Sequence, residues 1–414
     1  MTNKLYFKLM KALLIVFLSM TLSAQNLVLD KINNSIEDYG INVQFNYTGE
    51  VFSNLSGGLY RKSIYLDNFD LIFDLDLNRS FGWNGAIINT HILGNNGGPL
   101  SKYCGAIQGI SNIEANNTWK LYEFFIEQHL FDKKLSLLLG LFDLNSEFDT
   151  RETSSIFINP SHGIGAEFAL TGENGPSIFP TTSVALRAKY NFSNSLDFKL
   201  AIFDGIPGDL NNPNGTKVIL SRGDGFLISS EINLLSNSQN FENGYFKFAL
   251  GTWFYTNKFN KLISSDNPDN PFPKTRNYGF YLSAEKFLFA ENNVTNQGLA
   301  AFIRIGFADT KVNQVDGYYG VGINYVGLIT GRDEDICGIS IAASHNSSSY
   351  RQLIINKGLS RIIEEYEYIF ELTYKFSLLE FLTIQPDLQY VINPSLCINN
   401  DHTIAFGTRL QVLF

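Results

Sequence analysis

Short runs in which apolar and polar residues alternate recur along nearly the whole chain of 414 residues. In the run that starts at residue 41, Ile41, Val43, Phe45 and Tyr47 alternate with Asn, Gln and Thr. Side chains of a β-strand point alternately to the two faces of a sheet, so each run predicts a strand with one apolar and one polar face. About sixteen such runs predict an all-β fold. They cover residues 41–47, 69–75, 83–93, 122–126, 135–143, 184–188, 198–202, 226–232, 246–254, 278–282, 299–307, 319–325, 337–341, 368–374, 382–390 and 404–414.

The first 24 residues have the layout of a secretory signal peptide. Three lysines precede the apolar run 12–18, and small residues lead to Ala24, after which we expect cleavage. Removal of three of the 31 basic residues leaves 28 against 40 acidic ones, a formal net charge of −12. This balance argues against nucleic acid as a partner. No later stretch reaches the roughly 18 apolar residues that a spanning helix needs, so any membrane crossing must use strands.

The mature chain, residues 25–414, is predicted to form one domain, a transmembrane antiparallel β-barrel of about sixteen strands. Connections between the runs alternate between long and short, as in outer-membrane barrels. Closure is required because a sheet edge in lipid leaves backbone groups unpaired. Strands of a soluble β-sandwich or solenoid also have alternating apolar and polar residues. Such a fold does not explain why nearly every run carries charges on its polar face.

The segment 144–181 is the longest one without an alternating pattern, and it lies between two clear runs. Long connections of this kind are usually functional or disordered. Apolar anchors such as Phe148, Phe157 and Phe168 favour an ordered segment. We expect it to fold inward as a constriction loop that narrows the pore.

Strand phase and the 144–181 segment supply the candidate pore-lining and substrate-binding residues, which are mostly charged. These are Glu123, Glu127, Asp143, Glu147, Arg151, Arg187, Lys189, Trp253 and Arg304. The alternative for any one charge is that it is solvated in the lumen or anchors the loop. Trp253 is either a stacking platform for a sugar ring or, one register away, a lipid-facing girdle residue.

No catalytic motif is present, whether Gly-x-Ser-x-Gly, His-Glu-x-x-His or a phosphate-binding Gly-Lys-Ser/Thr loop. The three cysteines, Cys104, Cys337 and Cys397, lack metal-ligand spacing, although a Cys104–Cys397 bridge is compatible with the predicted loops. The sequence therefore predicts no enzyme activity, no cofactor and no metal site.

Several segments resemble the carbohydrate-selective porin family (OprB-type) of Gram-negative outer membranes. The segments are 121–128, 140–148, 157–159, 175–180, 187–190, 203–209 and, the most specific, 384–394 (IQPDLQYVINP). The resemblance extends over essentially the whole mature chain. One departure is Leu141, where many relatives would have Lys.

The resemblance implies passive, facilitated diffusion of small neutral carbohydrates through the outer membrane, with outer-membrane lipid around the barrel. A general or organic-ion diffusion porin is the alternative, and a barrel enzyme or adhesin is a third one. The sequence leaves open whether barrels associate as a homo-oligomer.

Overall fold

The computed structural model describes residues 38–236, 244–263, 272–291, 297–359, 363–396 and 400–413. The predicted signal peptide, residues 1–24, lies outside these ranges and stays a prediction, and so does the bridge to Cys397, which is also outside them. Cys104 is a buried free cysteine in the structure.

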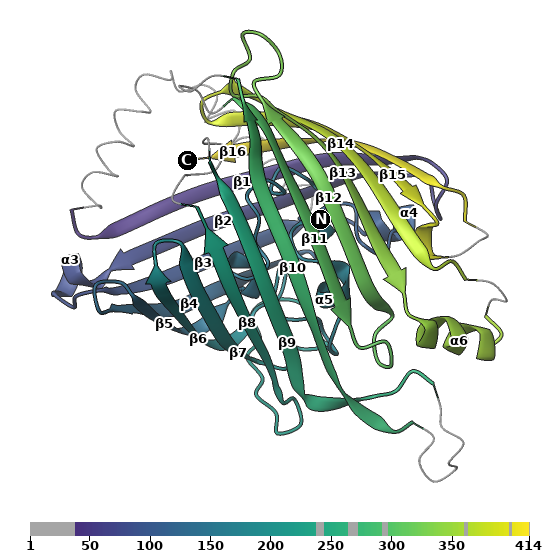
Figure 1. Ribbon diagram of the computed structural model, residues 1–414, viewed down its shortest axis with the longest axis horizontal. Coiled ribbons are helices and arrows are strands. Elements are labelled where there is room, and N and C mark those ends of the chain that lie inside the picture. The colour runs from purple at the N-terminus through teal and green to yellow at the C-terminus, as the bar shows by residue number, and fades with distance from the viewer. Residues whose placement is uncertain are drawn as a thin grey trace, which may run out of the picture.

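Sixteen antiparallel strands form a closed barrel in which each strand pairs with its neighbours in sequence and β1 pairs with β16 (Figure 1). Every predicted run is a strand, and the third begins at Ala86, slightly later than expected. The strands are β1 Ile41–Ser56, β2 Ser63–Asp76, β3 Ala86–Asn96, β4 Thr118–Leu130, β5 Leu135–Phe142, β6 Ser183–Ser193, β7 Leu196–Asp204, β8 Phe226–Leu235, β9 Phe246–Asn260, β10 Lys274–Ala290, β11 Gly298–Ala308, β12 Val315–Val326, β13 Ile336–Asn346, β14 Tyr366–Leu379, β15 Leu382–Ile392 and β16 Thr403–Leu413.

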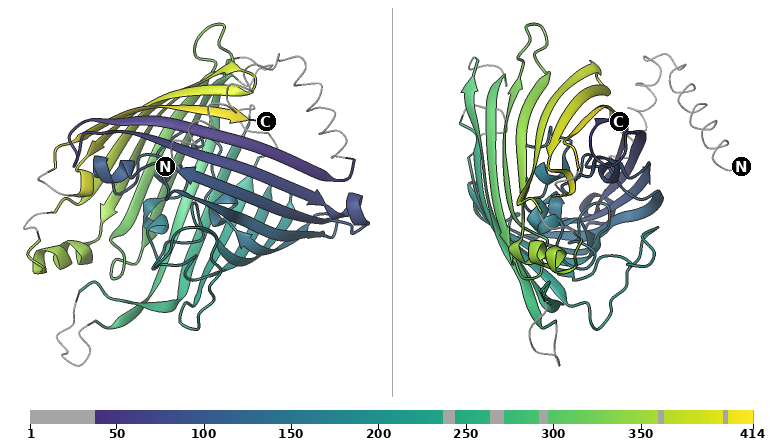
Figure 2. Two further views of the ribbon diagram at one scale, coloured as in Figure 1. Left: turned by 180° about the vertical axis from the view of Figure 1, so that it is seen from behind. Right: turned by 90° about the vertical axis from the view of Figure 1, so that its right-hand side faces the viewer.

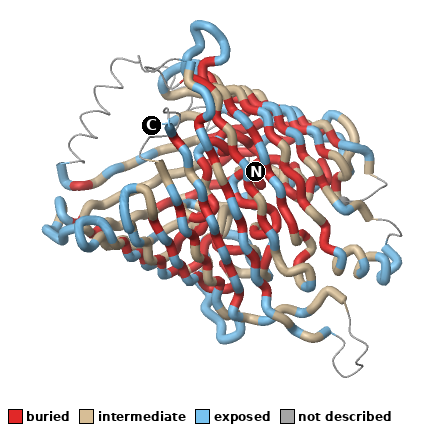
Figure 3. The backbone as a smooth tube through the Cα atoms, viewed as in Figure 1, coloured by how far each residue is buried: buried red, intermediate tan, exposed pale blue. Residues whose placement is uncertain are grey.

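Alternation along each strand separates an apolar outer face from an inner face that carries the polar residues. In β9, Phe248, Leu250 and Phe254 are exposed, whereas Ala249 and Trp253 between them are buried. The same regular change of exposure runs along the other strands (Figure 3). The barrel is therefore apolar outside and polar inside, the reverse of a soluble domain.

Two connections fill part of the barrel interior, and Figure 2 (right) shows blue and teal chain between its opposite walls. One is residues 97–117 between β3 and β4, with helix α4 Leu100–Cys104. The other is the 144–181 segment, with the 3₁₀ turns η1 Leu144–Ser146 and η2 Pro160–His162 and helix α5 Ala166–Ala169. Two more helices lie outside these connections, α3 Leu77–Phe81 and α6 Ser348–Asn356, and η3 is Pro394–Leu396.

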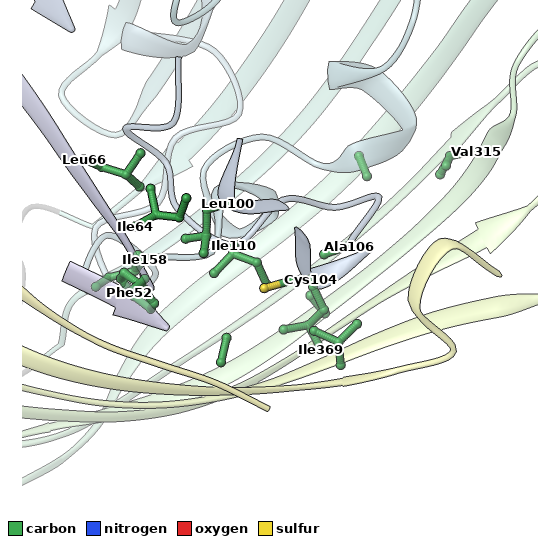
Figure 4. Packing of buried hydrophobic residues seen from close by; sticks show 14 of the residues in the cluster. Phe52, Ile64, Leu66, Leu100, Cys104, Ala106, Ile110, Ile158, Val315 and Ile369 are labelled. Atoms are coloured by element: carbon green, nitrogen blue, oxygen red, sulfur yellow. The ribbon is translucent and has the colours of Figure 1, made fainter. Parts of the chain in front are cut away.

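The 97–117 segment is inside because its apolar side chains have partners on the barrel wall. Leu100, Cys104 and Ile110 are fully buried in a cluster with Phe52 of β1 and Ile369 of β14 (Figure 4). The sequence did not predict this second inward segment. Within the described residues no helix is long and apolar enough to cross a membrane.

Candidate functional site

Arg304 of β11 is the central anchor of the 144–181 segment. Its Nη2 donates to Asp149 Oδ2 at 2.8 Å and its Nη1 to Glu167 Oε2 at 2.6 Å. The guanidinium also lies 5.2 Å from the ring centroids of Tyr281 and Tyr318, within cation–π range. Arg304 is 1 % exposed, so in this structure it anchors the segment instead of facing the lumen.

Arg151 braces the same segment from within. Its Nη1 donates to Asp149 Oδ1 at 2.5 Å, and its Nη2 donates to the carbonyl oxygens of His162 and Gly163, both at 2.8 Å. Asp149 is therefore shared by two guanidinium groups, one from the segment and one from β11. Because Arg151 is buried, it anchors the segment and does not contact a solute directly.

Buried glutamates on the inner wall hold the segment by its backbone. Glu231 of β8 accepts from the amide of Asp149 at 2.7 Å, and Glu285 of β10 accepts from the amide of Thr153 at 2.7 Å. Further round the barrel, Glu371 of β14 accepts from the amide of Ile158 at 2.6 Å. Each of these buried carboxyl groups accepts from the backbone of the segment, so together they fix its path across β8 to β14.

The 97–117 segment is held in the same way. Glu367 of β14 accepts from the amides of Ile107 and Gln108, each at 3.0 Å. The two inward segments also contact each other, because the amide of Asn112 donates to the carbonyl of Ile158 at 2.9 Å. Together they cover the inner wall from β8 to β16.

Arg187 of β6 joins two partly exposed carboxylates at the edge of this covered region. Its Nη2 donates to Glu127 Oε1 of β4 at 2.9 Å and to Glu147 Oε1 at 2.7 Å. The side chains of Glu127 and Glu147 are 20 % and 23 % exposed, whereas that of Arg187 is 1 % exposed. Arg187 thus links two partly exposed side chains, although Oε2 of Glu147 is itself buried. Lys189, two residues further along β6, is half-buried.

A second polar cluster lies on the inner wall of β2, β3 and β4. The Nε2 of His91 lies 2.9 Å from Asp70 Oδ1, and its Nδ1 lies 3.5 Å from Glu123 Oε2. Glu123 Oε1 accepts from the amide of Asp143 at 2.9 Å, and the hydroxyl of Tyr122 donates to Asp143 Oδ2 at 2.6 Å. Burial, and then the charge of Glu123, raise the pKa of Asp143 from 3.8 to about 7.

Trp253 is on the inner face, which excludes the lipid-facing alternative. Its ring stacks on Phe168 of the 144–181 segment, with centroids 4.8 Å apart and an interplanar angle of 3°. The side chain is 1 % exposed. The predicted role as an open stacking platform for sugar is therefore wrong for this structure, because Phe168 already occupies the ring face.

The structure groups the predicted residues into three sets. Arg151 and Arg304 meet at Asp149; Glu127, Glu147 and Arg187 form one ion-paired group; and Glu123 and Asp143 belong to the His91 cluster. Lys189 and Trp253 lie outside these sets. His91 and Tyr122 were not among the predicted site residues, although Asp70, the partner of His91, lies on the polar face of its run. Across the described ranges, no group of His, Cys, Asp and Glu side chains has metal-binding geometry.

Comparison with known proteins decides the family. A family model described as "Carbohydrate-selective porin, OprB family" matches residues 61–414. The chain belongs to the carbohydrate-selective porin (OprB) family. The porin is 25 % identical over 406 residues to Porin B of Pseudomonas aeruginosa, covering 91 % of this chain and 88 % of that protein.

Solved structures agree on the fold of the porin. The high-pH structure of Pseudomonas putida OprB superposes with a TM-score of 0.82 at 24 % identity, covering 92 % of this chain and 96 % of that one. The low-pH structure of the same protein gives a TM-score of 0.61 at 21 % identity, covering 95 % and 98 %. Membership of this family makes the chain a channel of a Gram-negative outer membrane and not an enzyme. Its association into a homo-oligomer stays a prediction.

Proposed function

We propose that the porin conducts small neutral sugars by passive, facilitated diffusion along the inner wall of β2 to β6. The observation that carries this proposal is the uneven cover of the lumen. Anchors under the inward segments, such as Glu231 and Glu371, are 1 % exposed, whereas the Asp70 side chain on β2 is 19 % exposed. The 144–181 segment would then narrow the pore against this wall.

The chemistry of the wall suits a neutral solute that is dense in hydroxyl groups. The partly exposed side chains of Glu127 and Glu147 offer acceptors, and the ammonium group of Lys189 offers a donor on the same side of the lumen. Hydrogen bonds to charged groups are stronger than those between neutral groups, so sugar hydroxyls can replace lost water there. A distributed set of weak contacts permits both entry and release, which conduction requires.

Liposome swelling tests the proposal directly. We expect monosaccharides to enter faster than amino acids of equal size, and Glu127→Gln/Glu147→Gln to reduce this preference severalfold. Asp132→Asn/Glu291→Gln is the matched control, because both residues are exposed in connections between strands and the charge change is the same. If monosaccharides and amino acids entered in the order of their size alone through the unmodified protein, the protein would be a general diffusion porin.

A second function, diffusion of small organic cations, is favoured by one observation. Asp70, Glu123 and Asp143 gather on a single wall around His91. Reversal potentials across a salt gradient separate the two functions. Strong cation preference without any block of the current by sugar would support the organic-ion porin and contradict the sugar channel.

A further inference from the structure

The hairpin of β9 and β10 carries positive charge on its outer face, at the end that leads to the 261–273 connection. Lys258, Lys274 and Arg276 are all exposed there. Alternation places them on the same face as Phe254, Tyr278 and other exposed apolar side chains of the outer wall. These two strands are among the longest in the barrel, and Figure 1 shows the hairpin running past the ends of its neighbours at the lower edge.

Two of these cations face each other directly. Arg276 is the cross-strand partner of Lys258, and Lys274 pairs with Asn260 on the same face, two residues along the strand. Like charges at directly opposite positions destabilise a sheet, so this arrangement is unfavourable without an anion. Within the described part of the chain, none of the three side chains forms an ion pair with a carboxylate. A bound anion would offset this repulsion between like charges.

The position of the three cations relative to the membrane indicates which anion binds to them. The 261–273 connection lies at the same end as the long 144–181 segment, and long connections of outer-membrane barrels are extracellular. Tyr278, the next outward residue after Arg276 on β10, is 56 % exposed. Exposed aromatic side chains mark the membrane interface, so the cations lie just above it, among the lipid headgroups.

Neighbouring connections add basic residues at the same distance from the membrane. The amide of Leu262 donates to the carbonyl of Lys311 at 2.9 Å, which places the β11–β12 connection beside the hairpin. On the other side, the Asn257 side chain donates to the carbonyl of Gly223 at 2.7 Å, one residue after the exposed Arg222. The carboxylate of Asp309 accepts from the amide of Lys311 at 2.7 Å, and its negative charge offsets part of the positive charge of Lys311.

We propose that Lys258, Lys274 and Arg276 bind the phosphate groups of a phosphorylated glycolipid in the outer leaflet. A guanidinium matches a phosphate with two parallel hydrogen bonds, and an ammonium adds a point charge. Acyl chains of the same lipid would lie against Phe254, Tyr278 and Phe280 of the outer wall below. The site is separate from the solute pathway, because these side chains point away from the lumen.

Binding of purified lipid A to the porin in detergent tests the proposal. We expect the unmodified porin to bind the diphosphorylated form more tightly than the monophosphorylated form, and Lys258→Gln/Arg276→Gln to weaken binding at least tenfold. The matched control is Lys133→Gln/Lys134→Gln, which removes two charges from the exposed 131–134 turn at the opposite end of the barrel. Sugar permeation should remain unchanged in both variants, which also shows that both form functional barrels.

Charge reversal separates lipid binding from a structural role. Lys258→Glu creates an opposite-charge pair with Arg276, so its melting temperature should equal or exceed that of the unmodified porin while lipid A binding is lost. Equal binding by the variants and the unmodified porin would overturn the proposal. Equal loss of binding in the control would also overturn it. Displacement of lipid A by inorganic phosphate at the same concentration would do so too, because it would indicate a site for small anions.

Discussion

At the scale of single residues, the charged side chains inside this barrel mainly anchor the two inward segments. Arg304 contacts two carboxylates and two tyrosine rings, and Gly306 beside it has no room for a larger residue. A Cβ on Gly306 would lie 2.0 Å from Glu167 Oε1 and 2.3 Å from Arg304 Nη1. Arg304, Asp149 and Glu167 hold one another in place. Arg304 is therefore a positioning residue for the 144–181 segment.

Replacement of Arg304 should therefore release the segment and leave the barrel closed. Arg304→Met leaves Asp149 and Glu167 buried with less compensation, and loss of one partner of a buried ion pair costs about 3–5 kcal/mol. We expect faster proteolysis within residues 144–181 and a higher conductance. Arg79→Met is the control, because Arg79 pairs with Asp76 at the surface, where the side chains are 60 % and 43 % exposed and such pairs contribute about 0–1 kcal/mol. Equal protease resistance of Arg304→Met and the unmodified porin would contradict the anchoring role.

Asp143 should make ion selectivity depend on pH near neutrality. Its pKa is raised to about 7, so the carboxylate is ionised at pH 8 and mostly protonated at pH 6. The wall with Asp70, His91 and Glu123 then loses negative charge as the pH falls, and cation preference should decrease. Reversal potentials at pH 8 and pH 6 measure this change. Asp143→Asn should be less cation-selective at pH 8 and should show a smaller change, and an undiminished change would assign the effect to another group.

At the scale of elements, the two inward segments behave as one plug with anchors on most of the wall. Residues 97–117 attach mainly to β1 and β14–β16, and residues 144–181 attach to β6–β15. Contacts between the segments, such as the Asn159 side chain donating to the carbonyl of Gly109 at 3.0 Å, make each one part of the support of the other. Fewer anchors lie on β2–β5, where Lys120 of β4 donates to the carbonyl of Pro180 at 2.8 Å, and the proposed solute path therefore follows β2–β6.

Shortening the 144–181 segment should widen the channel. Replacement of residues 154–171 by a short Gly-Ser linker removes α5 and the contacts to Glu371 and Arg304, so single-channel conductance should rise severalfold and sugar discrimination should fall. The same replacement in α6 is the control, because none of its residues is buried. Unchanged conductance of the shortened segment would mean that it does not narrow the pore.

At the scale of the whole molecule, the fold was predictable and the interior arrangement was not. The two-residue period is a local property, so each of the sixteen runs marked its strand, and most runs also marked the lumen-facing phase. Tyr122 is an exception: it was predicted on the apolar face but lies in the inner cluster, beside a register irregularity between β3 and β4. The position of the 97–117 segment depends on partners such as Glu367, 260 residues beyond Ile107. Strand phase left Trp253 open between the inner face and the lipid-facing side, and its cover by Phe168 comes from a segment about 85 positions earlier.

Distribution of the anchors round the wall has a consequence for the order of assembly. Glu231, Glu285 and Glu371 lie on strands that come together only as the sheet curls up, and β16 must join β1 before the cylinder is complete. A half-built sheet would leave these carboxylates without their amide donors, while long-range contacts carry the cost of closing long stretches of chain. We therefore expect the plug to become ordered last. A cylinder with a strand out of register would not offer all of the anchors at once, so docking of the plug would favour the correct register.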